Sequence, residues 1–380
     1  MAKTDMHILY VASSTIPSRT ANSIHVMKMC QAFCQLGHQV ELCVPRYDNP
    51  SVPEPTGEIW EHYGIRGEFP IRWLSTTARY RGYDFAARAV RYAHRVRAEL
   101  VYTRTLSAAV IAAMWGIPTI YEIHEPPRTA FNRLSYRLLM QGRGLRRLVV
   151  ITQALKDLLA AKTAGKDVLV LPDGVDLERF EDMPAAAVSR QRLGLSDAPL
   201  TLGYAGHLYA GRGIELILEL ARRFPQFQFL IAGGNDQDID RYRQQTRDDR
   251  IANVLFLGFI PNAKLPQYLA ACEVLLMPYQ RNVAASGGQD TMAWASPLKM
   301  FEYMATGRLI IASDLPVLRE ILSPANCVLC PPDCVDAWQQ AIERAAALPE
   351  WREAIGAQAR QDVTQYSWTR RAQRALAGIT

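Results

Sequence analysis

The sequence lacks any uninterrupted apolar run of the 18 or more residues that a membrane-spanning helix needs. Its first apolar stretch, residues 7–12, is short and has neither the basic flank nor the cleavage site of an export signal. With 49% hydrophobic and 21% charged residues, the composition excludes a disordered or collagen-like chain. We therefore expect a folded cytoplasmic protein without a transmembrane helix.

Two further signals are missing. The Gly-x-Gly-x-x-Gly spacing of dinucleotide-binding folds does not follow the first expected strand, which disfavours a dehydrogenase. The seven cysteines are an odd number without an export signal, so structural disulfides are not expected. Cys327, Cys330 and Cys334 have a spacing that permits a metal site. We favour a buried strand followed by a helix capped by Asp333, because a fourth ligand is not evident nearby.

Charge is unevenly distributed along the chain. The net charge is +6, yet residues 1–172 hold 22 Lys and Arg against 13 Asp and Glu, a net +9. Basic residues are dense in 79–97 and 133–147, where aromatic and aliphatic residues are interleaved. The first half therefore indicates an anionic partner: a membrane surface, an anionic acceptor or nucleic acid. No nucleic-acid-binding module is recognised.

Short apolar runs alternate with amphipathic stretches over most of the chain. Strands are expected at 7–12, 39–44, 118–122, 148–151, 168–171, 200–205, 227–232, 254–257, 273–277, 309–312 and 327–330. Helices are expected between them, and the pattern restarts after a polar segment at 178–199 that fits a linker. This alternation predicts an α/β protein of two doubly wound parallel domains facing each other across a ligand-binding cleft.

Four segments of the second half carry glycine-rich or polar chemistry at strand ends. Residues 203–215 form a strand, a glycine-rich turn and a helix start, with Arg212 adding a cation. Two more strands end in glycine, at 233–234 and at 258. In the fourth segment, Ser296 is expected to cap a helix that starts at Pro297. The free N–H groups of residues 298 and 299 would then suit a phosphate.

Glu302 lies about one turn after Lys299 on that expected helix. A cation beside a phosphate and a carboxylate one turn further on suit the diphosphate and ribose hydroxyls of a nucleotide. A surface Lys–Glu pair on a capped helix remains the alternative. Asp238 and Asp240 match the pattern of a metal-binding Asp-x-Asp motif. They lie in a polar stretch that is expected to face solvent, so we assign no metal.

The order of these segments resembles the retaining GT-B enzymes of glycosyltransferase family 4. The most specific stretch is Ser296–Ala305, which runs Ser-Pro-Leu-Lys-Met-Phe-Glu-Tyr-Met-Ala and is followed by a strand at 309–314. Segments 18–40, 171–176 and 254–279 also resemble the family pattern, so that the likeness covers nearly the whole chain. It implies an acceptor domain at 1–172, joined by a C-terminal helix at 365–380 that returns to it, and a nucleotide-sugar domain at 173–364.

The resemblance also implies roles for individual residues. Catalytic roles fall on His124 near the donor sugar, and on Arg212 and Lys299 at the diphosphate. The donor nucleotide would be held by Gly206, His207, Arg212, Gly234, Ile260, Leu298, Lys299 and Glu302, with the Ile260 backbone at the base and Glu302 at the ribose. No metal and no cofactor is implied beyond the donor substrate, because cations and helix N-termini would meet the diphosphate charge.

Three positions depart from the family pattern. His207 stands where many members have Arg, and it is a weaker cation at neutral pH. Trp294 stands eight positions before Glu302, where a Glu commonly meets the donor sugar, and nearby Asp290 is a substitute. Asn22 and Ser23 replace the double glycine of the first loop and offer other donors. We assign Asn22, Ser23, Asp290 and Trp294 to the donor sugar or acceptor.

The sequence thus predicts a retaining hexosyltransferase that moves a sugar from a nucleotide sugar, a UDP-sugar, to an acceptor hydroxyl. The acceptor is a sugar or a lipid-linked molecule of cell-surface polysaccharide, lipopolysaccharide or glycolipid synthesis, which would bring the protein to the inner face of a membrane. The alternatives are a GT-B nucleotide-sugar epimerase, which would turn over donor without acceptor, and a non-catalytic nucleotide-sugar-binding protein.

Overall fold

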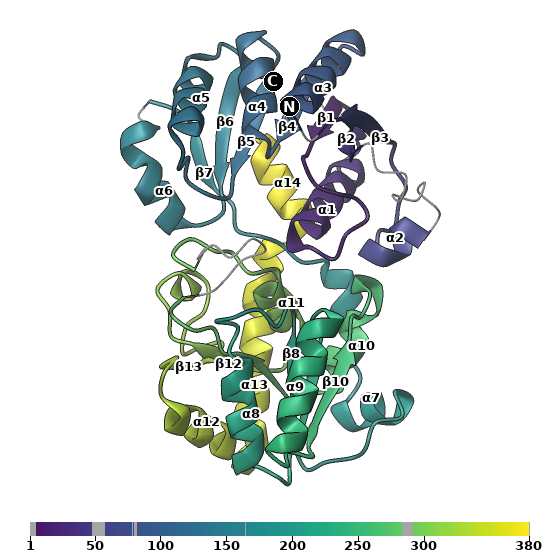
Figure 1. Ribbon diagram of the computed structural model, residues 1–380, viewed down its shortest axis with the longest axis vertical. Coiled ribbons are helices and arrows are strands. Elements are labelled where there is room, and N and C mark those ends of the chain that lie inside the picture. Colours follow the sequence, from purple (N-terminus) through teal and green to yellow (C-terminus); the bar gives the residue numbers. More distant parts are fainter. Residues whose placement is uncertain are drawn as a thin grey trace. The chain divides into compact units, whose positions relative to one another are not determined.

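The computed structural model describes residues 5–47, 58–77, 79, 82–163, 165–282 and 292–379. The chain divides into two compact units, of which the first is Met1–Asp173 together with Trp368–Thr380 and the second is Gly174–Ser367. The C-terminal residues therefore belong to the same unit as the N-terminal ones (Figure 1).

The first unit contains a seven-stranded sheet in the order β3-β2-β1-β4-β5-β6-β7. Its strands are β1 His7–Val11, β2 Gln39–Tyr47, β3 Ile71–Thr76, β4 Leu100–Thr103, β5 Thr119–Ile123, β6 Leu145–Val150 and β7 Val168–Val170. All of its strand pairs are parallel. The carboxyl ends of the strands therefore meet at one edge, where ligands bind in open α/β sheets.

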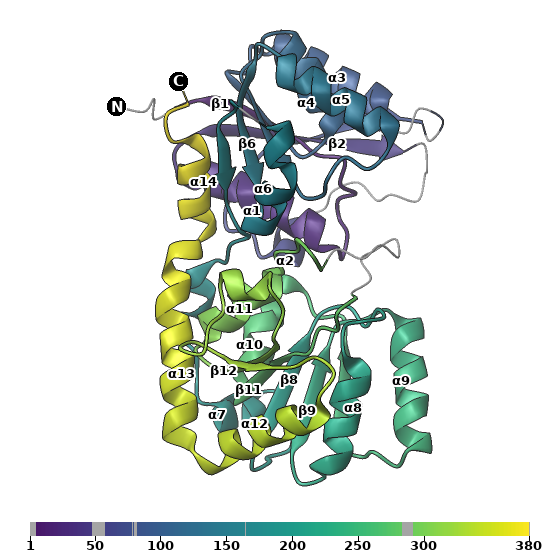
Figure 2. The same ribbon diagram turned by 90° about the vertical axis from the view of Figure 1, so that its left-hand side faces the viewer.

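Helices cover both faces of this sheet. They are α1 Ala21–Gln35, α2 Glu58–Tyr63, α3 Tyr83–Arg95, α4 Leu106–Met114, α5 Ala130–Gln141, α6 Gln153–Leu159 and α14 Trp368–Leu376. Helices α3, α4 and α5 lie side by side in one layer (Figure 2). On the other face α14 packs against α1, which ties the end of the chain to its beginning.

Strands β3 and β4 were not expected from the sequence. Strand β4 has only four residues, Leu100–Thr103, and all of them are buried between its neighbours β1 and β5. Such a short apolar run gives no periodic signal of its own between two helical patterns. Strand β3 lies at the edge of the sheet and is mostly half-buried, so its residues lack the apolar character of a central strand.

The second unit contains a six-stranded parallel sheet in the order β10-β9-β8-β11-β12-β13. Its strands are β8 Thr201–Ala205, β9 Gln228–Ala232, β10 Val254–Gly258, β11 Val274–Met277, β12 Leu309–Ser313 and β13 Val328–Cys330. Its helices are α7 Ala186–Arg192, α8 Ile214–Arg223, α9 Asp236–Asp248, α10 Leu265–Ala270, α11 Leu298–Thr306, α12 Val335–Ala347 and α13 Pro349–Asp362. One core lies under α8, α9 and α12, and a second lies under α10, α11 and α13.

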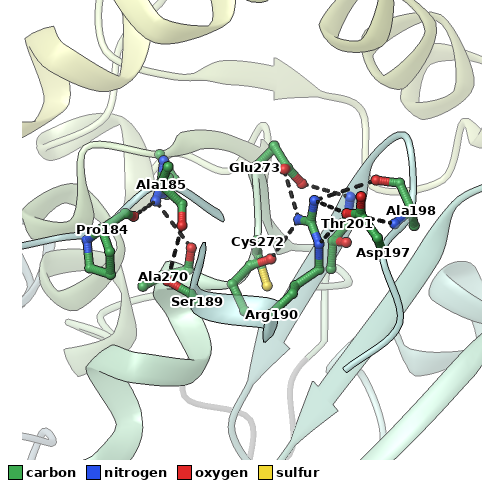
Figure 3. Close-up of polar contacts among 12 residues, drawn as sticks. Pro184, Ala185, Ser189, Arg190, Asp197, Ala198, Thr201, Ala270, Cys272 and Glu273 are labelled. Carbon is green, nitrogen blue, oxygen red and sulfur yellow. Dashed lines mark hydrogen bonds and ion pairs between the residues drawn. The ribbon is translucent and has the colours of Figure 1, made fainter. Parts of the chain in front are cut away.

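The expected linker at 178–199 is partly helical, because it contains α7. Arg190 of this helix is buried, and Figure 3 shows its guanidinium between Asp197 and Glu273. Its Nη1 donates to Glu273 at 2.8 Å, and its Nη2 donates to Asp197 at 2.9 Å. Glu273 also accepts the N–H of Thr201 at 2.8 Å. The polar residues of the segment therefore anchor α7 to the starts of β8 and β11.

Two local expectations need correction. Helix α11 begins at Leu298 with Pro297 as its N-cap, one residue later than expected, so Ser296 does not cap it. Helix α12 is capped by Cys334, whereas Asp333 pairs with Arg281 at 3.3 Å. The polar stretch that contains Asp238 and Asp240 forms α9. Among the described helices, none is long and apolar enough to cross a membrane.

Candidate functional site

Three strands of the second unit end in glycines that touch one another. Gly206 follows β8 and donates its N–H to Ala232 at 2.8 Å, and Gly233 follows β9 and donates to Gly258 at 2.7 Å. Gly206 has φ 143° and Gly233 has φ 108°, which residues with a side chain rarely adopt. A Cβ on Gly233 would lie 2.3 Å from the Gly206 carbonyl oxygen. The carboxyl edge of this sheet is therefore formed at Gly206 and Gly233 by backbone atoms without side chains.

Lys299 points its ammonium group at this glycine edge from α11. A Cβ on Gly206 would lie 2.7 Å from Lys299 Nζ. The Nζ atom is buried, has no hydrogen-bond acceptor among the residues that the structure describes, and lies 3.8 Å from the centroid of the Tyr204 ring and 5.1 Å from that of Tyr279. Burial and the repulsion of Arg212 hold the pKa of Lys299 well below its usual value, against the attraction of Glu302. A buried cation without an acceptor is costly unless an anion binds beside it.

Arg212 lies close to the same rings. Its Nη1 donates to the Tyr279 hydroxyl at 2.9 Å, and its guanidinium lies 5.0 Å from the Tyr279 ring centroid. The carbonyl of His207 accepts a bond from the Tyr204 hydroxyl at 2.6 Å, and its imidazole stacks on Tyr209 with centroids 4.7 Å apart. The structure thus brings the predicted residues Gly206, His207, Arg212 and Lys299 together.

The tyrosines of this cluster were not predicted. Tyr204 and Tyr279 belong to strand-end segments that the sequence marks as important, but no sequence signal places their rings on Lys299. Tyr303, one turn after Lys299, accepts the N–H of Ala205 at 2.7 Å and joins α11 to β8. Aromatic faces attract cations by their quadrupole, so the rings of Tyr204 and Tyr279 favour the ammonium form of Lys299.

Glu302 is positioned by Asn262, which the sequence did not single out. Asn262 Nδ2 donates to Glu302 Oε1 at 3.0 Å, and Arg179 Nη1 donates to Asn262 Oδ1 at 2.7 Å. Asn262 stands two residues after Ile260, the predicted base contact. Because the carboxylate of Glu302 has two oxygens with several lone pairs, it retains acceptor capacity for further hydroxyl groups.

The N-terminus of α11 and the remaining predicted positions complete this site. Leu298 and Lys299 are the first two helical residues, so their N–H groups have no carbonyl partner within the helix. Gly234 ends β9 with φ 85° next to Leu208. Trp294 is half-buried just before α11. Asp290 and the rest of the expected loop at 286–290 lie outside the described residues.

Two further parts of the second unit have the residue spacing of metal sites, and one lies on a surface helix and the other in the core. Asp238 and Asp240 lie on α9 and pair loosely with Arg241 and Arg243 on the same helix, at 3.7 and 3.9 Å. Cys327 and Cys330 are buried. Among the described residues, neither pair belongs to a group of three or more His, Cys, Asp or Glu side chains whose ligand atoms could hold a metal ion.

In the first unit, His124 follows β5 and belongs to a buried network. Its Nε2 lies 2.5 Å from Glu122 Oε1, and its side chain is 22% exposed. Burial and the nearby Arg104 lower the pKa of His124 to about 4, against the opposing effect of Glu122. The imidazole is therefore neutral at physiological pH, with one edge directed into the protein.

The partners of Glu122 come from segments far apart in the sequence. Arg371 of α14 approaches it with Nη1 at 3.1 Å and Nη2 at 3.0 Å, and the Tyr102 hydroxyl donates to it. His25 of α1 lies between two carboxylates, with Nε2 2.8 Å from Glu122 and Nδ1 2.7 Å from Asp173. None of these residues was predicted from the sequence as part of a site, although the alternation of a strand places Glu122 on the same face as His124.

His25, Glu122 and His124 are the group of side chains, within the described part of the chain, whose ligand atoms could hold a metal ion. Both oxygens of Glu122 are taken by the guanidinium of Arg371, and each imidazole already hydrogen-bonds to a carboxylate. A cation at the same carboxylate would compete with Arg371 for the same lone pairs. The donor set fits a satisfied polar network better than a metal centre.

Asn22 and Ser23 begin α1 in the same unit. Ser23 is buried, and its hydroxyl donates to the carbonyls of Ser18 at 3.0 Å and Thr20 at 2.9 Å. Asn22 is exposed, and its carbonyl faces Arg104 Nη1 at 3.4 Å. The hydroxyl of Ser23 therefore shapes the loop, while the Asn22 side chain is accessible.

Comparison with protein families gives two matches that together span most of the chain. Residues 23–179 match the model described as Glycosyltransferase Family 4. Residues 199–347 match the model described as Glycosyl transferases group 1. Each match falls mainly in one of the two structural units.

Individual proteins of known activity are more distant. The chain is 28% identical over 208 residues to 2-deoxystreptamine glucosyltransferase from Streptomyces kanamyceticus. The aligned region covers 53% of this chain and only 52% of that protein. It is 23% identical over 376 residues to phosphatidyl-myo-inositol mannosyltransferase from Mycolicibacterium smegmatis, covering 91% of this chain and 86% of that one.

Among solved structures, HepE from Anabaena in complex with UDP-glucose superposes with a TM-score of 0.73 at 18% identity, covering 98% of both chains. At this identity the likeness shows the fold alone, two parallel α/β units of the GT-B type.

Proposed function

Because the chain belongs to glycosyltransferase family 4, we propose that it is a retaining hexosyltransferase that moves a sugar from a UDP-sugar to an acceptor hydroxyl. The observation that carries this proposal is the buried amine of Lys299, which lies at the glycine edge of the second unit and has no hydrogen-bond acceptor within the described part of the chain. A diphosphate bound at that edge would supply the missing anion.

The chemistry of the surrounding groups supports a nucleoside diphosphate. Arg212 is a cation, Lys299 becomes one beside a bound anion, and the N-terminus of α11 adds N–H donors and the positive end of the helix dipole. In the proposed reaction these groups, without a metal ion, would neutralise the leaving diphosphate. They act most strongly in the transition state, where the glycosidic bond breaks and the β-phosphate gains charge.

The nucleoside would extend from the diphosphate toward Glu302. The carboxylate, which Asn262 orients, would accept hydrogen bonds from ribose hydroxyls, and the backbone at Ile260 would meet the base. The assignment of uridine is supported by the fold shared with HepE, which was solved with UDP-glucose.

Retention of configuration follows in our proposal from attack on the same face as the leaving group. The acceptor oxygen would bond to the anomeric carbon as the carbon–phosphate oxygen bond breaks, through an oxocarbenium-like state. The leaving phosphate would take the acceptor proton. His124 remains neutral in this scheme and hydrogen-bonds to a hydroxyl of the transferred sugar, without forming a covalent bond.

The acceptor is proposed to be lipid-linked, in glycolipid, lipopolysaccharide or cell-surface polysaccharide synthesis. Helix α5 exposes Phe131 and Leu134, each 55% accessible, and Leu138. Arg133 and Arg137 are exposed on the same helix. Apolar side chains beside cations are suited to the interface of an anionic membrane. The relative from Mycolicibacterium smegmatis is named for a lipid acceptor, phosphatidyl-myo-inositol. Tyr80 and Arg81 of the other basic stretch lie outside the described residues.

The proposal is tested by thermal unfolding of the full chain with UDP, GDP, ADP and their common sugars. A ligand at 100 times its Kd stabilises by about 2.7 kcal/mol. We expect stabilisation by UDP and a UDP-sugar, loss of it in Lys299→Met, and retention in the control Lys264→Met, whose lysine is exposed in the same unit. No stabilisation by any nucleotide would overturn the proposal.

Product analysis separates the alternatives. Transfer of labelled sugar to a glycolipid or saccharide acceptor fits a transferase. Isomerisation of the donor without acceptor would indicate an epimerase instead, and tight binding without any turnover would indicate a binding protein.

A further inference from the structure

We infer that Glu122 is a positioning residue for His124: it holds the imidazole as the Nε2–H tautomer, so that Nδ1 is presented to the substrate as a hydrogen-bond acceptor. This inference rests on the proposed function only in that His124 meets the substrate. The tautomer itself is a property of the free protein.

The geometry fixes which ring atom faces inward. His124 Nε2 lies 2.5 Å from Glu122 Oε1. The two residues are separated by Ile123 at the end of β5, so both side chains project from the same face of the strand. Because a carboxylate at this distance occupies Nε2, the other ring nitrogen, Nδ1, is the one left for a ligand.

The protons in the network can be assigned from its partners. Glu122 receives both guanidinium nitrogens of Arg371, at 3.0 and 3.1 Å, together with the Tyr102 hydroxyl. Despite burial, Arg371 and His25 hold the pKa of Glu122 well below its usual value. An ionised carboxylate can only accept, so the hydrogen between it and His124 belongs to Nε2.

Burial keeps His124 neutral. Desolvation and the nearby Arg104 lower its pKa to about 4, against the opposing effect of Glu122. His25 lies beside the same carboxylate, with Nε2 2.8 Å from Glu122 and Nδ1 2.7 Å from Asp173. Glu122 also faces the guanidinium of Arg371 and the hydroxyl of Tyr102. The carboxylate therefore needs from His124 only the hydrogen on Nε2 and no charge on the ring.

Helix α14 therefore contributes to the site through one side chain. Arg371 is 3% exposed, and besides Glu122 it donates to the carbonyls of Leu171 at 3.1 Å and Pro172 at 2.8 Å. Its two terminal nitrogens contact one oxygen of Glu122 each, and this fixes the orientation of the carboxylate. Neutral Nε2–H imidazole offers a substrate hydroxyl an acceptor, whereas the other tautomer would offer a donor at the same place.

The direct test is two-bond 15N–1H correlation NMR of the full chain labelled at its seven histidines, at pH 7 and without substrate. The His124 signals are identified by their loss in His124→Asn. We expect the pattern of a neutral imidazole with hydrogen on Nε2. Hydrogen on Nδ1, or an imidazolium pattern at pH 7, would overturn the inference.

Variants connect the tautomer to function. Glu122→Gln offers His124 an amide that can donate as well as accept, so a mixture of tautomers and a lower kcat at similar KM are expected. Tyr102→Phe is the matched control, because Tyr102 bonds to the other oxygen of Glu122, Oε2, and not to the one facing His124. It should lower the thermal midpoint yet keep the tautomer.

The outcomes distinguish the two proposals. An unchanged tautomer in folded Glu122→Gln, or a kcat change of the same size in Tyr102→Phe, would contradict positioning by Glu122. The expected tautomer in a protein that transfers no sugar would leave the inference on the tautomer intact and overturn the proposed function. If Glu122→Gln does not fold, the spectrum of the unaltered protein still decides the assignment.

Discussion

The Nζ atom of Lys299 lies 3.8 Å from the centroid of the Tyr204 ring, over its face. A cation–π contact of this kind attracts the charged form of the side chain, but burial and Arg212 hold its pKa well below the usual value. The amine is therefore placed at the glycine edge of the second unit, where an anion that arrives from solution favours its protonation.

The first prediction is that nucleotide binding takes up protons. Burial and Arg212 hold the pKa of Lys299 well below its usual value in the free protein. A diphosphate beside the ammonium favours the charged form, so its pKa rises on binding. Affinity for UDP should then fall as the pH rises between the two pKa values. Calorimetry in buffers with different ionisation enthalpies measures the uptake.

In the same experiment, uptake by Lys299 should vanish in Lys299→Met and persist in Lys264→Met. Equal heats in all buffers for the unaltered protein across pH 7–9 would show that Lys299 does not change its protonation on binding.

The second prediction concerns Glu302. Glu302→Ala should weaken UDP binding by about 1.5–3 kcal/mol, the worth of a hydrogen bond to a charged group. Asn262→Ala should weaken it by about 1 kcal/mol, because the carboxylate stays but loses the donor that orients it at 3.0 Å. Isothermal titration measures both. Glu343→Ala, an exposed glutamate of α12, is the control, and unchanged affinity in folded Glu302→Ala would exclude a ribose contact.

Much of the fold could be predicted because its signals are local. Central strands such as β1 and β12 are continuous apolar runs, and their helices have apolar faces, so alternation alone indicates two parallel α/β sheets. Strand β4 was missed because its four residues, Leu100–Thr103, become a strand only through pairing with β1 and β5. Helix α7 was missed because its helical pattern lies within a polar segment whose anchoring residue, Arg190, is buried through distant partners.

The residues of the candidate sites also divide into those that have a local sequence signal and those that have none. Gly206, Lys299 and Glu302 stand in segments with recognisable spacing, and the structure brings the first two together. Tyr204, Asn262, His25 and Arg371 act through contacts between residues up to hundreds of positions apart. Arg371 meets Glu122 across 249 positions, and no periodicity or motif within one sequence encodes such a pairing.

The third prediction concerns Arg212. Arg212→Ala should lower kcat by on the order of 10²-fold and change KM less, because its charge matters most when the diphosphate leaves. The exposed Arg222→Ala on α8 is the control. A rise in KM with unchanged kcat would indicate uniform binding instead. Activity should also persist in excess EDTA, and its loss would restore a metal-dependent mechanism.

The fourth prediction is a pH dependence of stability caused by His124. Its pKa is lowered from 6.5 to about 4 in the folded protein. Between these values the unfolded chain binds a proton that the folded chain excludes. The free energy of unfolding should therefore fall by about 3 kcal/mol as the pH falls through this window. Urea unfolding at pH 7, 6, 5 and 4 measures it.

The two carboxylates of the network act at lower pH. The pKa values of Glu122 and Asp173 are held low, mainly against burial, by Arg371 and His25 respectively. Their contribution is present above their unfolded pKa values near 4 and is lost as the pH falls below them. In His124→Asn the free energy of unfolding should change less between pH 6.5 and 4, whereas its fall at lower pH, caused by the two carboxylates, should remain. An unchanged slope in that variant would assign the effect to other groups.

The last prediction tests the proposed membrane contact of α5. Each arginine close to an anionic leaflet adds about 1 kcal/mol, and buried apolar side chains add to this, so a few residues suffice for reversible attachment. The protein should co-sediment with anionic vesicles at low salt and much less at high salt, because exposed charges are screened. Phe131→Ser with Leu134→Ser should weaken pelleting, whereas Leu158→Ser, which removes a similarly exposed leucine from α6, should not. Absence of pelleting with anionic vesicles at low salt, or equal loss in the α6 control, would contradict the contact and favour a soluble acceptor.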